Sequence, residues 1–332
     1  MSGEKTLVIG SNAFSGQDFV DLLLDDPSRN VIGVSRSPEY APQKLRYLDR
    51  ANSSRFSFHQ MDLNHDLDAL VTLLDRERPQ WIVNFAAQSE VGPSWRHPEH
   101  WFETNTVALA KLVNILNTRD YVARYLHISA PEASGNCVGT VVEGTPDNPS
   151  TPYAASKAAA DMLLKVYWKE FKFPVQFVRA TNVYGARQQL FKIIPRSAIY
   201  IRLGKKIPLD GGGTAVKSYI HVRDVSAGEL AILERGEVGE MYHLSPRAGI
   251  AVRDVVRTVC DALGKSFDQA VELAPERPGQ DSQYVIDSTK ARNCLGWEPK
   301  ISFEEGISEL VAWTEKNWDF IQTQPLEYRH KP

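Results

Sequence analysis

The seven residues from Thr151 to Lys157 read TPYAASK and form the segment most suited to chemistry. Threonine is a good N-cap and proline a good first helical residue, so we expect a helix to begin here. Tyr153 and Lys157 are four residues apart and therefore share one helix face. An ammonium group about 4 Å from a phenol, at an effective dielectric constant near 20, lowers the phenol pKa by roughly three units. The spacing predicts a Tyr153–Lys157 pair that moves a proton.

A second segment with chemical potential follows the first apolar run, where residues 10–16 read GSNAFSG. Glycines at a strand-to-helix turn let the backbone approach a pyrophosphate, which the N–H groups of the helix start then bind. Ala13 occupies the middle position, where a methyl group fits if the backbone φ is negative. The pattern alone also fits a tight turn without a ligand. The residues expected to contact a cofactor here are Gly10, Asn12, Ala13, Phe14, Ser15 and Gly16.

The next apolar run ends at Val34 and is followed by Ser35, Arg36 and Ser37. NAD-binding proteins usually place a carboxylate near this point to bind the ribose 2′-hydroxyl. A guanidinium instead binds a 2′-phosphate through two parallel hydrogen bonds, whereas a carboxylate repels it. The sequence therefore favours NADP over NAD. The alternative is that Arg36 is a solvated loop charge.

These segments need a scaffold, and the first half of the chain supplies a strand–helix alternation. Apolar runs at residues 6–9, 31–34, 56–60, 81–85, 125–129 and 175–179 are separated by amphipathic stretches. Strands that are apolar on both faces indicate a parallel sheet covered by helices on each side. The predicted fold is α/β: a Rossmann-like, doubly wound parallel sheet of residues 1–181 with about 218–245. Residues 182–217 and 246–332 are expected to form a smaller, mixed α/β substrate-binding lobe.

Composition excludes several classes of protein. The 332 residues include 38 Lys and Arg against 41 Asp and Glu, a net charge of −3 that argues against a nucleic-acid partner. No apolar run approaches the roughly 18 residues that span a bilayer, so we expect no membrane partner. The chain starts with a short polar stretch and no secretion signal, which predicts a cytoplasmic protein.

Neither the cysteines nor the histidines predict a metal site. Cys137, Cys260 and Cys294 are far apart and in no CxxC pattern, so we expect neither a disulfide framework nor a cysteine zinc site. The segment His97-Pro98-Glu99-His100 offers two imidazoles, but the proline marks a helix start and the sequence shows no third ligand. We expect no bound metal.

Taken together, these motifs resemble those of extended short-chain dehydrogenase/reductases, in the NAD-dependent epimerase/dehydratase family that acts on nucleotide-diphosphate sugars. Residues 86–91 (AAQSEV) are similar to the family's AAQS segment, and residues 179–185 (RATNVYG) to its RxxNxYG. Residues 277–281 (RPGQD) and 295–299 (LGWEP) resemble its RPGHD and LGWxP. The resemblance covers nearly the whole chain and implies a nicotinamide cofactor and a homodimer, formed by the helix of residues 101–116 and the Tyr153 helix. The apolar positions of these helices equally fit ordinary core-facing stripes.

The resemblance also implies which residues contact each ligand. Beyond the first turn and residues 35–37, cofactor contacts are expected from Asp62, Leu63, Phe85, Ala86, Ala87, Gln88, Tyr153 and Lys157. Contacts to a nucleotide-diphosphate sugar are expected from Ser89, Glu90, Asn182, Lys192, Lys217 and Arg277.

The segment His127–Glu132 (HISAPE) bears on the reaction, because the 4,6-dehydratases of the resembled family read STDE or STSE there. In that chemistry Tyr153 takes the C4 hydroxyl proton, Glu132 takes the C5 hydrogen as water leaves C6, and hydride returns to C6. A 4-epimerase needs no such carboxylate. Glu132 therefore favours a 4,6-dehydratase, although a strand-end carboxylate in a structural hydrogen bond fits the same position.

Ala130 departs from this pattern because it stands where the dehydratases carry threonine. The missing hydroxyl is expected to slow the reaction about ten- to a thousandfold, unless Ser129 or a water replaces it. A 4-epimerase, a C6 decarboxylase of the same family, and a member that binds its ligand without turnover remain as alternatives.

Overall fold

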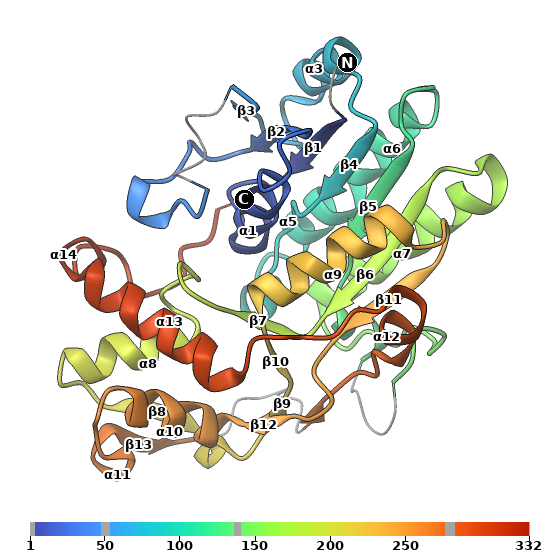
Figure 1. Ribbon diagram of the computed structural model, residues 1–332. Helices are drawn as coiled ribbons and strands as arrows, with labels where there is room; N and C mark the ends of the chain where they lie inside the picture. The colour runs from blue at the N-terminus through green and yellow to red at the C-terminus, as the bar shows by residue number, and fades with distance from the viewer. Residues whose placement is uncertain (1–3, 48–53, 136–140, 276–282, 332) are drawn as a thin grey trace.

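The structure is a computed structural model that describes residues 4–47, 54–135, 141–275 and 283–331. Its centre is a seven-stranded sheet in the order β11-β6-β5-β4-β1-β2-β3, with every neighbouring pair parallel (Figure 1). The predicted doubly wound parallel fold is confirmed: the six expected strands lie in this sheet, and β11 adds a seventh. The strands are β1 (Lys5–Ile9), β2 (Asn30–Ser35), β3 (Phe56–Gln60), β4 (Trp81–Asn84), β5 (Arg124–Ile128), β6 (Val175–Ala180) and β11 (Met241–Leu244).

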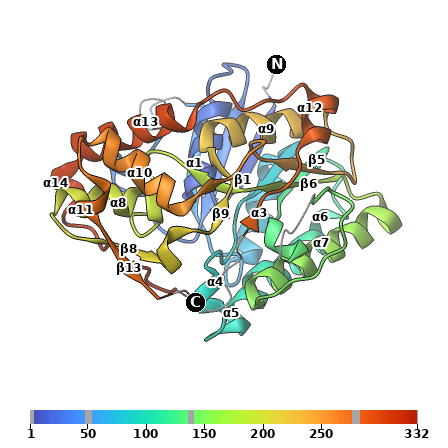
Figure 2. The same cartoon turned by 90° about the horizontal axis from the view of Figure 1, so that it is seen from below.

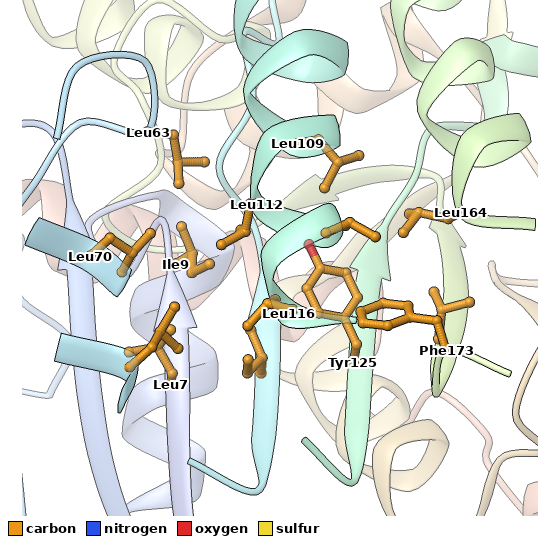
Figure 3. Packing of buried hydrophobic residues seen from close by; sticks show 14 of the residues in the cluster. Leu7, Ile9, Leu63, Leu70, Leu109, Leu112, Leu116, Tyr125, Leu164 and Phe173 are labelled. Carbon is orange, nitrogen blue, oxygen red and sulfur yellow. The ribbon is translucent and has the colours of Figure 1, made fainter. Parts of the chain in front are cut away.

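Helices cover both faces of the sheet, because successive side chains of a strand point to opposite sides. Leu7 and Ile9 of β1 pack on one face, and Val8 between them packs on the other. Figure 3 shows the first of these clusters, with helix residues pointing towards the strands. The first face carries α3 (Leu67–Glu77), α6 (Leu109–Leu116) and α7 (Pro152–Phe171). The second carries α1 (Phe14–Leu23), α9 (Val222–Arg235) and α12 (Thr289–Leu295).

The strand order reverses at β1, which pairs with β2 on one side and β4 on the other. Connections leave the sheet in opposite directions at such a point and open a crevice at the carboxyl ends of the strands, where α/β proteins bind ligands. The segments after β1, β2, β3 and β4, which hold most of the predicted cofactor contacts, all end at this edge.

A smaller part of the molecule is built on short strands and a helical cluster. Ile194, Val255 and Leu310 of α8, α10 and α13 pack together in its core. The strand pairs are β7 (Asn182–Tyr184) with β10 (Tyr219–His221), β8 (Ile207–Asp210) with β13 (Val271–Ala274), and β9 (Val216–Lys217) with β12 (Ile250–Ala251) and β14 (Gln283–Tyr284). The helices are α8 (Ile193–Arg202), α10 (Val252–Ala262), α11 (Phe267–Ala270), α13 (Phe303–Lys316) and α14 (Trp318–Ile321).

Short helical segments complete the sheet edge, and the C-terminal chain returns to it. Figure 2 shows the C-terminus beside α4 and α5, and the His330 ring stacks on Trp101 of α5 with 5.1 Å between centroids. In the described part of the chain no helix has both the length and the apolar character needed to cross a bilayer. The short segments are η1 (Pro42–Lys44), α4 (Val91–Ser94), α5 (Pro98–Phe102), η2 (Glu103–Ala108), η3 (Pro131–Ser134) and η4 (Gly211–Gly213).

Candidate active site

The turn after β1 requires its outer glycines. Gly10 has φ +83°, and a Cβ atom there would lie 2.7 Å from the backbone N of Ala86. A Cβ atom at Gly16 would lie 2.3 Å from the carbonyl oxygen of Gly10. Ala13 has φ −63°, so its methyl group fits without strain, as expected from the sequence. The turn is therefore a close-packed cradle that tolerates alanine only at its middle position.

The end of β2 is tied to this turn by hydrogen bonds. The backbone N–H of Asn12 donates to Ser35 Oγ (2.9 Å), and Asn12 Nδ2 donates to the carbonyl of Ser37 (3.1 Å). Arg36 is exposed and lines the adjoining cleft together with Lys44. Two cationic side chains thus stand near the end of β2, where an NAD-binding site usually has a carboxylate.

A cleft of about 750 Å³ runs along the carboxyl ends of β1, β2, β3 and β4. This volume falls within the usual range for cofactor sites, roughly 300–1,000 Å³. The predicted site residues that line it are Gly10, Asn12, Ala13, Ser35, Arg36, Ser37, Asp62, Leu63, Phe85, Ala86, Ala87, Gln88, Ser89 and Glu90. Phe14, Ser15 and Gly16 form the first turn of α1 beside it.

Several lining residues were missed by sequence reasoning. Tyr40 and Lys44 come from the loop after β2, and Thr104 comes from η2. Residues 189–191 and the C-terminal residues 324–325, 327–329 and 331 also line the cleft. Residues 189–191 follow the RATNVYG segment closely, which could have pointed to them. The C-terminal residues carry no sequence signal for a site.

The Tyr153 helix begins as predicted. Thr151 is the N-cap of α7 and its Oγ1 accepts from the backbone N–H of Ala154 (3.1 Å), while Pro152 is the first helical residue. Lys157 is buried, and its Nζ donates to the carbonyl of Ile128 at the end of β5 (2.7 Å). This bond fixes the ammonium group between α7 and the sheet.

The electrostatics of this pair differ from the sequence expectation. Burial lowers the pKa of Lys157 to about 8. The pKa of Tyr153 lies well above its ordinary value because of burial and then the charges of Glu132, Glu90 and Asp161. Burial and the three carboxylates thus act on the Tyr153 pKa against the lowering expected from a nearby cation. Any activation of the phenol needs a further positive charge or hydrogen-bond donor.

Glu132 lies in η3, which follows β5 closely, and its charge affects the pKa values of both Tyr153 and Lys157. Its charge is the largest cause after burial of the raised Tyr153 pKa, and it also acts to raise the pKa of Lys157. Ala130, two residues before it, is buried and is the N-terminal flanking residue of η3. A carboxylate, a phenol and an ammonium group are thus gathered at the end of β5.

The Ser129 hydroxyl is committed to a buried ionic network. It donates to Asp161 Oδ2 (2.5 Å) and accepts from Arg179 Nε (3.3 Å). Arg179 Nη2 also donates to Asp161 (2.7 Å) and to Asp147 (2.8 Å). Both hydrogen-bonding roles of this hydroxyl are taken, so Ser129 does not replace the missing threonine hydroxyl in this arrangement.

A π-helical turn, η2, couples the cofactor loop to the Tyr153 helix. Asn105 Oδ1 accepts from the backbone N–H of Gln88 (2.8 Å), and Asn105 Nδ2 donates to the carbonyl of Gln88 (3.0 Å) and to Ser156 Oγ (2.9 Å). Thr106 Oγ1 donates to the carbonyl of Ser156 (3.0 Å). Single π turns inside helices are frequent at functional sites. Sequence reasoning predicted one continuous helix here and missed this support.

The predicted substrate-binding residues are placed unevenly. Ser89 and Glu90 line the cleft, and Lys192 Nζ forms an ion pair with Glu90 Oε1 (2.7 Å). Asn182 donates to the carbonyl of Ser218 (3.0 Å) at the β7–β10 pair. Lys217 lies in β9. The predicted contact Arg277 lies outside the described residues.

Comparisons with known proteins agree with this geometry. The family model for GDP-mannose 4,6 dehydratase matches residues 7–310. A dTDP-glucose 4,6-dehydratase of Xanthomonas campestris pv. campestris is 31% identical over 336 residues, which cover 95% of this chain and 94% of that protein.

Solved structures give the same picture. The dTDP-glucose 4,6-dehydratase of Bacillus anthracis, in complex with NAD, superposes with a TM-score of 0.86 at 29% identity, covering 96% of this chain and 98% of the other. A UDP-glucose 4-epimerase of Thermotoga maritima, with UDP-glucose, has a TM-score of 0.85 at 25% identity, covering 95% and 99%. Dehydratases and epimerases thus share this architecture.

Proposed function

The chain belongs to the family of GDP-mannose 4,6-dehydratases, and on that premise we propose that it is a nucleotide-diphosphate-sugar 4,6-dehydratase. Its product is a 4-keto-6-deoxy sugar nucleotide. The observation that carries the proposal is the position of Glu132, whose carboxylate acts electrostatically on both Tyr153 and Lys157. Elimination across C5 and C6 requires a base for the C5 hydrogen, and epimerisation at C4 does not.

Two proton transfers are proposed, one to Tyr153 and one to Glu132. Tyr153 acts as a phenolate, which the ammonium group of Lys157, fixed on the carbonyl of Ile128, stabilises, and it becomes a neutral phenol when it accepts the proton of the C4 hydroxyl. Glu132 then accepts the C5 proton, which the C4 ketone has made acidic, and donates a proton to the C6 hydroxyl, which leaves as water; C5 takes up a solvent proton when hydride reaches C6. A nicotinamide dinucleotide, when bound, supplies the transfer of hydride from C4 and back to C6.

The turn after β1 fits such a dinucleotide, because Gly10, Asn12 and Ala13 line the cleft where the chain enters the N-terminus of α1. We propose NADP as the preferred form, since Arg36 and Lys44 line the cleft near the end of β2. The change Arg36→Asp is expected to weaken NADP relative to NAD by at least tenfold in a fluorescence titration of the reduced cofactors. An unchanged ratio overturns the NADP preference and leaves the dehydratase proposal untouched.

Three observations favour a second candidate, a member that binds its ligand without turnover. Ala130 lacks the hydroxyl, Ser129 is committed to Asp161 and Arg179, and the pKa of Tyr153 is raised. All three disfavour transfer of the C4 hydroxyl proton.

The decisive experiment incubates the protein with UDP-, dTDP-, GDP- and CDP-hexoses in deuterium oxide and follows the products by mass spectrometry. A dehydratase yields a product that has lost water and carries deuterium at C5. Glu132→Gln is expected to abolish both changes, with Glu103→Gln, an exposed acidic residue of η2, as the matched control. Unchanged mass with an inverted C4 in the proton NMR spectrum identifies an epimerase, and loss of carbon dioxide from a uronic acid identifies a decarboxylase. Unchanged mass and an unchanged NMR spectrum identify a silent binder.

We also propose that two copies associate through the α5–η2 and α7 surface. Five large apolar side chains of α5, η2 and α7, as the structure describes them, are exposed: Phe102, Val107, Met162, Val166 and Phe171. Val166→Glu is expected to convert a dimer into a monomer in sedimentation velocity, whereas Leu273→Glu, at an exposed apolar side chain of β13, is not. A monomeric wild-type protein contradicts this assembly.

A further inference from the structure

Two histidines and a glutamate meet at the start of α5. One ligand atom from each of His97, Glu99 and His100 lies within 4.8 Å of the other two. Glu99 Oε1 is 3.5 Å from His97 Nδ1 and 3.7 Å from His100 Nε2. Zinc binds imidazole nitrogen and carboxylate oxygen at about 2.0–2.2 Å, so neighbouring ligand atoms of a tetrahedral site lie roughly 3.3–3.6 Å apart. The two measured separations are close to this spacing.

The local backbone brings these three side chains to one end of the helix. His97 is the N-cap of α5, and Pro98 is its first helical residue. Glu99 and His100 follow in the first turn of the helix. The proline that argued against a metal in the sequence fixes the start of the helix that presents the ligands.

The third imidazole comes from the C-terminal segment. His330 Nε2 lies 2.8 Å from His100 Nδ1, and its ring stacks on Trp101 at 9°. His330 Nδ1 in turn lies 3.1 Å from the hydroxyl of Tyr328. If His100 coordinates through Nε2, its Nδ1 carries the hydrogen and donates to His330, which then donates to Tyr328. Metal-bound histidines usually donate their second N–H to such a partner, which fixes the ring and its tautomer.

We propose that His97, Glu99 and His100 bind a divalent transition-metal ion, with zinc the best match, and that His330 holds His100 in the tautomer this requires. Two imidazoles and one carboxylate are a typical zinc donor set, with water completing the coordination. The sequence prediction of no metal rested on the lack of a third ligand, and it did not consider Glu99 as a ligand or His330 as a partner of His100.

The C-terminal segment, which carries His330, also connects the metal site to the cofactor cleft. The carbonyl of Lys331 accepts from Gln88 Nε2 (2.7 Å) and from Arg36 Nη2 (3.3 Å). The cleft keeps its volume of about 750 Å³ with residues 327–329 and 331 along its wall, so the C-terminal segment borders the cleft without filling it. Metal binding that orients His100 towards His330 therefore favours the docked position of the C-terminal segment.

Titration of the chelator-treated full-length protein with zinc, by calorimetry, and with cobalt, by visible absorption, tests the site. One equivalent is expected to bind. His100→Ala and His97→Ala are each expected to weaken binding at least tenfold, and His330→Ala about tenfold, the usual effect of losing an outer partner. His65→Ala is the matched control, because His65 is an exposed imidazole beside a single carboxylate, Asp62 (3.6 Å). The absence of stoichiometric binding, or an affinity unchanged in His100→Ala, overturns the site.

Hydrogen–deuterium exchange of residues 324–331 tests the link to the C-terminal segment. Zinc is expected to slow exchange there in the wild-type protein and to have no effect in His330→Ala. His97→Ala, His100→Ala and His330→Ala remove exposed or half-buried side chains, so all three variants are expected to fold, and circular dichroism checks this. Zinc binding that leaves the exchange of this segment unchanged overturns the role of His330. Neither measurement depends on turnover, so failure here is distinct from failure of the proposed dehydratase activity.

Discussion

The buried region behind Tyr153 and the open edge of the cofactor cleft are held by different kinds of interaction. Behind Tyr153, Arg179 and Asp161 are 2% and 0% exposed, and both are hydrogen-bonded to each other and to Ser129. At the cleft edge, exposed Arg36 and Gln88 both donate to the backbone carbonyl of Lys331 in the C-terminal segment. A buried charge that loses its partner is costly, whereas exposed polar contacts contribute little. The first region therefore fixes the catalytic geometry, and the second can open for a ligand.

The largest expected effect comes from breaking the buried network. Arg179→Met leaves the Asp161 carboxylate buried without its cation and is expected to lower the free energy of unfolding by about 3–5 kcal/mol. Urea denaturation measures it. The matched control is Arg247→Met, which removes an exposed pair with Glu298 (3.4 Å) and is expected to cost less than about 1 kcal/mol. Equal losses in the two variants would remove the distinction between the regions.

The next largest effect is expected on kcat, when the hydroxyl group that Ala130 lacks is restored. Ala130→Thr is expected to raise kcat about ten- to a thousandfold, because Ser129 is already bonded to Asp161. Ala130→Val has the same shape without the hydroxyl and is the control for packing. Steady-state kinetics on the accepted sugar nucleotide measure both. If Ala130→Val raises kcat as much as Ala130→Thr does, the increase comes from packing, and the role of the hydroxyl is contradicted.

A pH dependence of stability should follow from Lys157. Its pKa is about 8 in the folded protein against 10.5 for the unperturbed group. The unfolded chain therefore binds more protons between these values, so this group makes the protein more stable as pH rises from 8 to 10. The gain is roughly 2 kcal/mol over this window. It is measured as the difference in urea unfolding between wild type and Lys157→Met, and a difference that does not change with pH is the contrary result.

The smallest effect on stability is expected at the cleft edge. Deleting residues 327–332 removes mainly exposed contacts and is expected to change the free energy of unfolding by less than about 1 kcal/mol. It is expected to weaken dinucleotide binding several-fold, since residues 327–329 and 331 line the cleft. Lys331→Ala keeps the backbone carbonyl that Gln88 and Arg36 bind and is expected to bind like wild type. If Lys331→Ala binds the dinucleotide as weakly as the deletion variant does, the binding depends on the Lys331 side chain instead of its backbone carbonyl.

Much of the scaffold was predictable from short-range sequence patterns. The apolar runs predicted six strands of the sheet, and Thr151 with Pro152 predicted the start of α7. The turn pattern allowed alanine at position 13 only with a negative φ, and the backbone there has φ −63°. The orientation of Ser129 was not predictable, because its partners Asp161 and Arg179 come from α7 and β6 and meet it only across the folded sheet.

The sequence by itself determined the doubly wound sheet, the turn at Gly10 and the shared face of Tyr153 and Lys157. Strand periodicity, glycine conformation and helix spacing each act over a few residues, so they can be read along the chain. Only the tertiary structure decided that burial and three carboxylates raise the pKa of Tyr153. The tertiary structure alone also brought His330 into contact with His100, which lies 230 residues earlier in the chain. Desolvation and contacts between distant segments exist only after the chain has packed.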